Sequence, residues 1–201
     1  MKINLIVIAI FVFFASSLAQ TDTSIVRLLH IDSTIVTDVR YATKNNFTGK
    51  ILYPDDKVFI RKIVGDSLAK ANQYLIDNYD LRIKIFDAFR PLSVQKQMWK
   101  ILPDNRYVAD PAKGSRHNRG AAVDITLIDS TGTQLDMGTG YDNFTKKAHF
   151  AYADLSDNQR RNRDLLRETM MKFGFEPITS EWWHFDFKGW KRFAILENVP
   201  R

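Results

Sequence analysis

The chain has 201 residues, of which 45% are hydrophobic and 26% charged, and it contains no cysteine. The absence of cysteine excludes disulfides, a thiolate zinc site and a cysteine-linked lipid anchor, and leaves histidine, aspartate and glutamate as the available metal ligands. The net charge of +6 comes from scattered basic residues with one denser patch at 160–163, which is typical of a solvated helix face. We therefore expect no nucleic-acid partner.

The N-terminus has the pattern of a cleaved export signal. Lys2 precedes an apolar stretch, and Ser17 and Ala19 place small side chains where a signal peptidase reads them. The stretch 3–19 is at the short limit for spanning a bilayer, and no strong cluster of charges follows it. We expect a signal peptide at 1–19 and a periplasmic or secreted mature chain without stable membrane association.

The remaining residues are enough for one compact domain with its own core. Removing the signal leaves 201 − 19 = 182 residues, and the loss of Lys2 lowers the net charge from +6 to +5. No repeat, linker or low-complexity tract divides this part of the sequence. We expect a single domain over 20–201, whose oligomeric state the sequence does not determine.

Helical and strand-like patterns follow one another in the first half of this domain. Apolar residues recur every three to four positions over 58–78, which predicts a helix. Residues 81–86 alternate apolar and basic, which is typical of a half-exposed strand. Pro91 suits a helix start, and a short helix is predicted over 93–101.

The second half adds two strands and a helix. Residues 122–127 and 183–187 alternate as strands do, and an apolar stripe over 165–173 predicts a helix that stops at Gly174. Strands and helices mix without regular alternation, which favours α+β over a doubly wound sheet. We expect a central, mostly antiparallel sheet with flanking helices that carries a metal site.

Two short segments about sixty positions apart contain the residue types of a hydrolytic zinc site. His117 and Asp124 lie in the first segment, and Glu181 and His184 in the second. Two imidazoles and one carboxylate can hold zinc with one position open for water, while the second carboxylate moves the proton. Gly120 would allow the chain to turn between His117 and Asp124. The alternation around Asp124 places it on the strand face opposite its apolar neighbours.

Glu181 and Arg90 are the further candidates for catalysis. Glu181 lies three residues before His184, and the two tryptophans between them favour a walled site in which desolvation raises its pKa, over a surface acid. Arg90 ends a predicted strand and precedes a proline. It would either stabilise an oxyanion or form a salt bridge with Asp87, and spacing alone does not decide between these roles. For His149 a structural role is favoured over a place beside substrate.

These residues resemble a known family, the zinc D-alanyl-D-alanine dipeptidases of the VanX type within the LAS peptidases. The resemblance rests on His117, Asp124 and the segment 181–184. It extends to segments 41–49, 87–91 and 137–142, which resemble further motifs of that family in the same order. It covers nearly the whole mature chain.

The resemblance implies a role for each candidate. One zinc ion per chain would be held by His117, Asp124 and His184, with Glu181 as catalytic base and Arg90 as transition-state stabiliser. Two histidines and one carboxylate also accept other divalent ions, so the native metal stays open.

The resemblance also implies a dipeptide pocket lined by Asp142, Ser115 and Tyr41. Asp142 would pair with the free ammonium of the substrate and reject longer chains, which have no charge there. Arg116 departs from the family pattern because it stands where a small serine is expected. It would approach the substrate carboxylate or face solvent.

The implied reaction is hydrolysis of the D-alanyl-D-alanine dipeptide to two D-alanine. The alternatives are a D,D-carboxypeptidase or endopeptidase acting on peptidoglycan stem peptides, and a non-catalytic peptide-binding module. The presence of Glu181 argues against the module, because metal binding alone needs no base. The resistance-linked members of the family act in the cytosol, so an exported relative would scavenge or recycle dipeptides from the cell wall.

Overall fold

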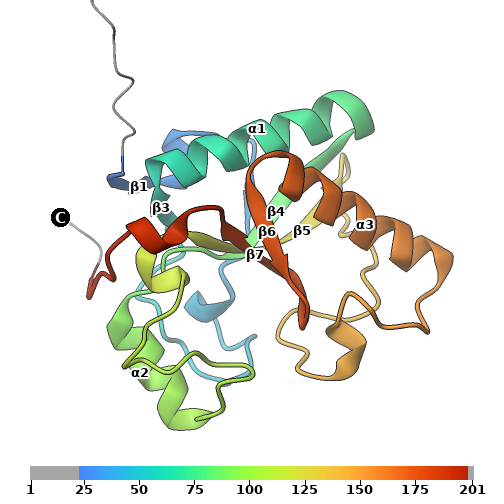
Figure 1. The fold of residues 1–201 in the computed structure, drawn as a ribbon. Helices are drawn as coiled ribbons and strands as arrows, with labels where there is room; N and C mark the ends of the chain where they lie inside the picture. The colour runs from blue at the N-terminus through green and yellow to red at the C-terminus, as the bar shows by residue number, and fades with distance from the viewer. Residues whose placement is uncertain (1–22, 199–201) are drawn as a thin grey trace, which may run out of the picture.

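A computed structural model describes residues 23–198, so the expected signal peptide at 1–19 lies outside the described residues. A five-stranded sheet forms the centre of the molecule (Figure 1). Its strands, in spatial order, are β2 (Val36–Thr37), β4 (Leu81–Asp87), β5 (Ala122–Asp129), β7 (Glu181–Phe187) and β6 (Phe175–Ile178). Only β2 and β4 pair in parallel, and the other three pairs are antiparallel. The prediction of an α+β domain with a mostly antiparallel sheet is confirmed.

Within residues 23–198, three α-helices surround this sheet. α1 (Lys62–Tyr79) packs on β4, α3 (Asp157–Lys172) packs on β6, and the two helices contact each other. Figure 1 shows α2 (Leu92–Ile101) on the other side of the sheet from α1. The strands β1 (Ile25–Arg27) and β3 (Phe59–Arg61) form a separate antiparallel pair. None of the helices within residues 23–198 combines the length and apolar character needed to cross a membrane.

Five short 3-10 helices complete the described part of the chain. They are η1 (Leu28–His30), η2 (Arg40–Ala42), η3 (His117–Arg119), η4 (Lys146–Ala148) and η5 (Trp190–Arg192). Three of these, η2, η3 and η4, lie in or beside the segments that surround the candidate site. The site is therefore built from irregular segments as well as from strands.

The helix predicted over 58–78 begins later than expected. Residues 59–61 form β3, and Arg61 is still extended, with φ −63° and ψ 136°. Ile60 is fully buried, so its position fits both a strand and the apolar stripe of the following helix. The periodicity alone therefore placed the start of the helix too early. The helix ends at Tyr79 and is capped by Asp80, which adopts the left-handed conformation with φ 54°.

The interpretation of the basic patch 160–163 as a solvated helix face is wrong for one residue. α3 begins after Ser156, whose side chain forms a capping box with Gln159. Arg163 lies on the inner side of this helix and is 2% exposed. Its guanidinium donates to the carbonyl oxygens of Met137, Lys147 and His149 at 2.7–2.9 Å. The patch thus contains a buried anchor for the segment 137–149.

β5 occupies the middle of the sheet, between β4 and β7, and is buried on both faces over 122–128. Val123, Ile125 and Leu127 pack into the core from one face. Asp124 and Thr126 occupy the other face and are equally inaccessible, at 3% and 0% exposure. The predicted orientation of Asp124 follows from the two-residue period of the strand. This places a buried carboxylate at the centre of the fold.

Candidate metal centre

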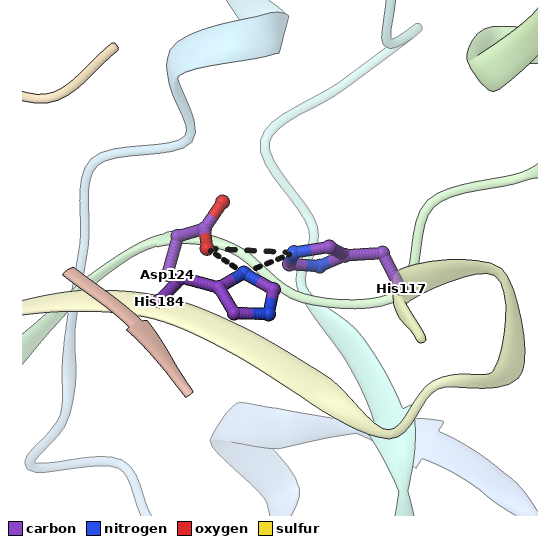
Figure 2. A group of neighbouring side chains, drawn as sticks. All are labelled: His117, Asp124 and His184. Carbon is purple, nitrogen blue, oxygen red and sulfur yellow. Dashed lines mark hydrogen bonds and ion pairs between the residues drawn. The ribbon is translucent and has the colours of Figure 1, made fainter. Parts of the chain in front are cut away.

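His117, Asp124 and His184 come together at one point of the structure (Figure 2). Asp124 on β5 is the direct cross-strand partner of His184 on β7, and His117 approaches from η3. Asp124 Oδ1 lies 2.9 Å from His184 Nδ1 and 3.4 Å from His117 Nε2. The two ring nitrogens are 3.2 Å apart. All three side chains are buried.

The triangle formed by these three atoms fits a zinc ion. Zinc bonds to nitrogen and oxygen are about 2.0–2.2 Å long, so a tetrahedral site places its ligand atoms about 3.3–3.6 Å apart. The three observed separations, 2.9, 3.2 and 3.4 Å, are close to this range. Imidazole and carboxylate are also the ligand types that a catalytic zinc takes.

The turn that presents His117 depends on Gly120. Gly120 has φ +64°, and its N–H donates to the carbonyl oxygen of His117, which closes η3. A Cβ atom at this position would lie 2.7 Å from Ile25 and 3.3 Å from the backbone nitrogen of Arg61. A side chain is thus excluded by both conformation and space. The expected role of Gly120 as the turn between the two segments is confirmed.

Each of the three side chains has a second partner that fixes its orientation. His117 Nδ1 donates to the carbonyl oxygen of Ala88 at 2.7 Å, so Nε2 faces His184 and Asp124 as the candidate ligand atom. His184 Nε2 lies 2.9 Å from Asp186 Oδ1, so Nδ1 faces the centre. The hydroxyl of Tyr141 donates to Asp124 Oδ2 at 2.9 Å and leaves Oδ1 toward the two imidazoles.

The sequence reasoning assigned no role to Asp186 or Tyr141. Asp186 shares a strand face with His184, so the two-residue alternation of β7 could have identified it. Tyr141 belongs to a loop, and no periodicity places its hydroxyl beside Asp124. Only the folded structure reveals that contact.

Arg90 forms the salt bridge that was one of its two predicted roles, and it also faces the pocket. Its Nε and Nη2 donate to Asp87 Oδ2 at 2.9 and 2.7 Å, and Nη1 donates to Gln95 at 3.0 Å. Nη2 also lies 4.0 Å from Asp124 Oδ2. Tyr53 donates to the other oxygen of Asp87. The ion pair therefore holds the guanidinium beside the candidate metal ligands.

Glu181 lines the same pocket as the three metal-ligand candidates. In a regular strand, residues three apart point to opposite faces, so Glu181 and His184 would diverge. The pairing with β6 is irregular here: Ile178 pairs with Glu181, whereas Pro177 pairs with Phe185. Such a bulge redirects side chains. Burial raises the pKa of the Glu181 carboxyl to about 7.

The two tryptophans before His184 have different places. Trp183 lines the pocket beside Glu181. Trp182 packs into the core and donates from its ring nitrogen to the hydroxyl of Thr139 at 2.8 Å. The predicted wall beside Glu181 is thus formed by Trp183, while Trp182 ties β7 to the loop that follows β5.

Asp142, Tyr41 and Ser115 also line this pocket, which has a volume of about 140 Å³. Asp142 accepts from the hydroxyl of Tyr41 at 3.2 Å and from the N–H of Phe47 at 3.1 Å. Burial raises the pKa of the Asp142 carboxyl to about 7. Its backbone is left-handed, with φ 59°, a conformation that aspartate and asparagine tolerate better than most residues. Ser115 accepts from the N–H of Asn118 at 3.1 Å.

His149 does not line this pocket, but its carbonyl oxygen accepts from buried Arg163. Arg163 thereby holds both ends of the loop that carries Asp142, through Met137 and His149. This contact involves the backbone of His149, so the structural role favoured for its side chain stays a prediction.

The chain is similar to several known proteins. A family model described as D-ala-D-ala dipeptidase matches residues 21–194. The D-alanyl-D-alanine dipeptidase of Escherichia coli K12 is 37% identical over 88% of this chain and 91% of its own. That of Enterococcus faecium is 32% identical over 74% of this chain and 83% of its own. A solved D,D-pentapeptidase VanY with Zn(II) matches at TM-score 0.43 and 17% identity, covering 69% of this chain and 78% of its own.

Proposed function

The chain belongs to the D-Ala-D-Ala dipeptidase family of metallopeptidases, and on this basis we propose that it hydrolyses D-alanyl-D-alanine to two D-alanine in a zinc-dependent reaction. His117, Asp124 and His184 hold one zinc ion, Glu181 is the general base, and Arg90 stabilises the transition state. The observation that carries the proposal is the triangle of three ligand atoms beside a carboxyl group of raised pKa in one small pocket.

Zinc bound at this centre supplies Lewis-acid activation of water and of the scissile carbonyl. Glu181 takes a proton from the attacking water and passes it to the leaving amine, so that one water and one amide become a carboxylate and an ammonium. Burial raises the pKa of this carboxyl group, which makes its carboxylate a better acceptor of the proton from water.

Arg90 acts on the charge that develops at the carbonyl oxygen. Its guanidinium is buried, and Asp87 and Gln95 fix its plane before substrate arrives. A donor oriented in advance stabilises the transition state without reorganisation. The salt bridge to Asp87 is therefore the means by which Arg90 is held in place.

Asp142 provides the end of the pocket that recognises the substrate ammonium. Its carboxyl is desolvated, so an ammonium that pairs with it replaces lost hydration and favours the ionised form. An acylated amine has no charge to offer, so a longer peptide would leave this carboxylate unpaired. Tyr41 orients the carboxyl, and Ser115 lines the pocket with a hydroxyl available to the substrate.

The small pocket favours a dipeptide over a stem peptide. A volume of about 140 Å³ lies below the about 300–1,000 Å³ of sites for larger ligands. With the N-terminal segment interpreted as an export signal, the enzyme would act in the periplasm or outside the cell. It would there recover D-alanine from dipeptides released by cell-wall turnover.

The variant Glu181→Gln tests the mechanism. We expect kcat on D-Ala-D-Ala to fall by about 10²–10⁴-fold, because the proton acceptor is lost, while zinc content stays at one ion per chain. Glu176→Gln removes the same charge from an exposed position of neighbouring β6 and should leave kcat unchanged. Full activity of Glu181→Gln would contradict the proposal. Faster cleavage of a pentapeptide stem than of the dipeptide by the wild-type enzyme would favour the carboxypeptidase alternative.

A further inference from the structure

Arg116 connects to the metal centre through a chain of contacts. Its Nε lies 3.2 Å from Asp186 Oδ2, and its guanidinium carbon lies 4.6 Å from the centre of the Trp190 ring. The other oxygen of Asp186 lies 2.9 Å from His184 Nε2. The guanidinium of Arg116 thus contacts the carboxylate of Asp186, which in turn contacts the imidazole of His184. Neither of the two roles expected for Arg116 includes this arrangement.

We propose that Arg116 is a positioning residue that holds the Asp186 carboxylate, which in turn fixes the ring of His184 as a metal ligand. The inference rests on the proposed zinc site. His184 must present Nδ1 to the metal, and the Nε2–H bond to Asp186 sets both its tautomer and the angle of its ring. Arg116 determines where Asp186 Oδ2, and therefore the whole carboxylate, lies.

The burial of Asp186 explains why it needs a cation. Its side chain is 7% exposed, so its carboxylate has lost most of its hydration. The hydrogen bond from His184 satisfies one oxygen, and a buried charge that is only partly compensated is costly. Arg116 is 44% exposed and satisfies the second oxygen. An ion pair this exposed contributes little to folding, so its effect should show in the geometry of the carboxylate.

The planar guanidinium is held at two places at once. One edge meets the carboxylate of Asp186, and one face lies over Trp190. Lysine offers a single flexible ammonium and cannot reproduce this combination of edge and face. The position therefore requires arginine specifically, and a positive charge alone does not suffice.

Arg116 also joins the two parts of the ligand set. Its carbonyl oxygen accepts from the N–H groups of Arg119 and Ala121, so its backbone belongs to the turn that presents His117. Its side chain binds the strand that carries His184. A displacement of either segment would therefore strain the same ion pair.

The sign of the effect on zinc affinity separates positioning from simple electrostatics. Arg116 is a cation near a cation-binding centre, so removal of its charge alone should tighten zinc binding. Loss of positioning should weaken it, because His184 is then less well oriented. Lys113, an exposed residue close to Arg116 in sequence, measures the plain charge effect.

Zinc affinity, measured by competition with a chromophoric chelator, provides the test. We expect Asp186→Asn to bind zinc about 10–100-fold more weakly than wild type, and both Arg116→Ala and Arg116→Lys about 3–10-fold more weakly. The double variant Arg116→Ala/Asp186→Asn should match Asp186→Asn within about twofold, because both act through one contact chain. Lys113→Ala should bind as tightly as wild type or slightly tighter.

Zinc affinity of Arg116→Ala and Arg116→Lys equal to or tighter than that of wild type would overturn the inference. So would a double variant in which the two losses add in full, or an equal weakening in Lys113→Ala. Thermal unfolding of the metal-free variants checks that the fold persists, and Arg116→Lys serves if Arg116→Ala unfolds. Failure of the wild-type protein to bind one zinc would instead contradict the proposed function.

Discussion

The two sides of the pocket are built in different ways. On the metal side, Asp124 and His184 are cross-strand partners in the middle of the sheet, and His117 enters from a turn closed by Gly120. On the loop side, Tyr41 and Asp142 come from the segments 40–49 and 137–149, which contain only short 3-10 helices. In the proposed function, the chemistry is fixed by the sheet, whereas recognition of substrate depends on loops held by individual side chains. Substitutions on the two sides should therefore differ in what they change.

Substitutions on the metal side should abolish activity because zinc is no longer bound. Loss of a residue that hydrogen-bonds to a metal ligand typically weakens metal binding by about 10–100-fold. We expect His117→Ala, which removes a ligand itself, to weaken zinc binding by more than this and to lower activity to background. The fold should persist, since the core does not depend on this ring. Zinc titration and circular dichroism provide the measurements, with exposed His30→Ala as the control. Full zinc affinity in His117→Ala would contradict the assigned ligand set.

Substitutions on the loop side should weaken substrate binding, while zinc stays bound. We expect Asp142→Asn to lower kcat/KM for D-Ala-D-Ala by about 10²-fold, as expected when a buried charge pair loses one partner. Asparagine tolerates the left-handed backbone of this position, so the loop should keep its path. Steady-state kinetics and zinc content are measured together, and exposed Asp154→Asn is the control. An unchanged kcat/KM would remove Asp142 from the ammonium site.

The same variant should be more stable than wild type at high pH. Burial raises the pKa of folded Asp142 from 3.8 to about 7, so folding takes up a proton between about pH 4 and 7. The cost of the buried carboxylate is fully present above pH 7 and vanishes below about pH 4. Asp142→Asn should gain about 1–2 kcal/mol at pH 8, since each pKa unit is worth about 1.4 kcal/mol and altered hydrogen bonds offset part of the gain. Urea unfolding at pH 8 and pH 4 measures this difference, and an equal gain at both values would contradict it.

Substitution of Arg163 tests whether the position of the loop side depends on this one buried side chain. Arg163→Met leaves carbonyl oxygens of segment 137–149 without donors, and we expect a loss of about 2–4 kcal/mol of stability with a raised KM. Zinc affinity should change little. Exposed Arg161→Met on the same helix is the matched control. A large loss of zinc affinity with an unchanged KM would reverse the assignment of the two sides.

Substitution of Tyr141 should have the smallest effect of these variants, because this residue contacts the metal side from a loop of the other side. Its loop belongs to the recognition side, but its hydroxyl binds Asp124 Oδ2. Tyr141→Phe should weaken zinc binding by about tenfold with little change in KM, and the exposed Tyr79→Phe should not. A change in KM alone would place Tyr141 with the substrate rather than with the metal ligand.

The same contrast explains what the sequence could predict. Asp124 and His184 lie on strands, where alternation with Val123 and Phe185 reveals which side chains face away from the core. Asp142 and Tyr41 lie on segments without a period, and only the resemblance to a family suggested them. The buried contacts of Arg163 and the bulge at Glu181 arise from tertiary packing, which no local pattern encodes.

The most direct test of the account is the release of D-alanine from D-Ala-D-Ala by the purified protein, before and after chelation and after addition of zinc. We predict cleavage that is lost on chelation and restored by one equivalent of zinc. The absence of cleavage by folded, zinc-loaded protein, or cleavage that survives complete removal of metal, would contradict the proposed zinc-dependent reaction.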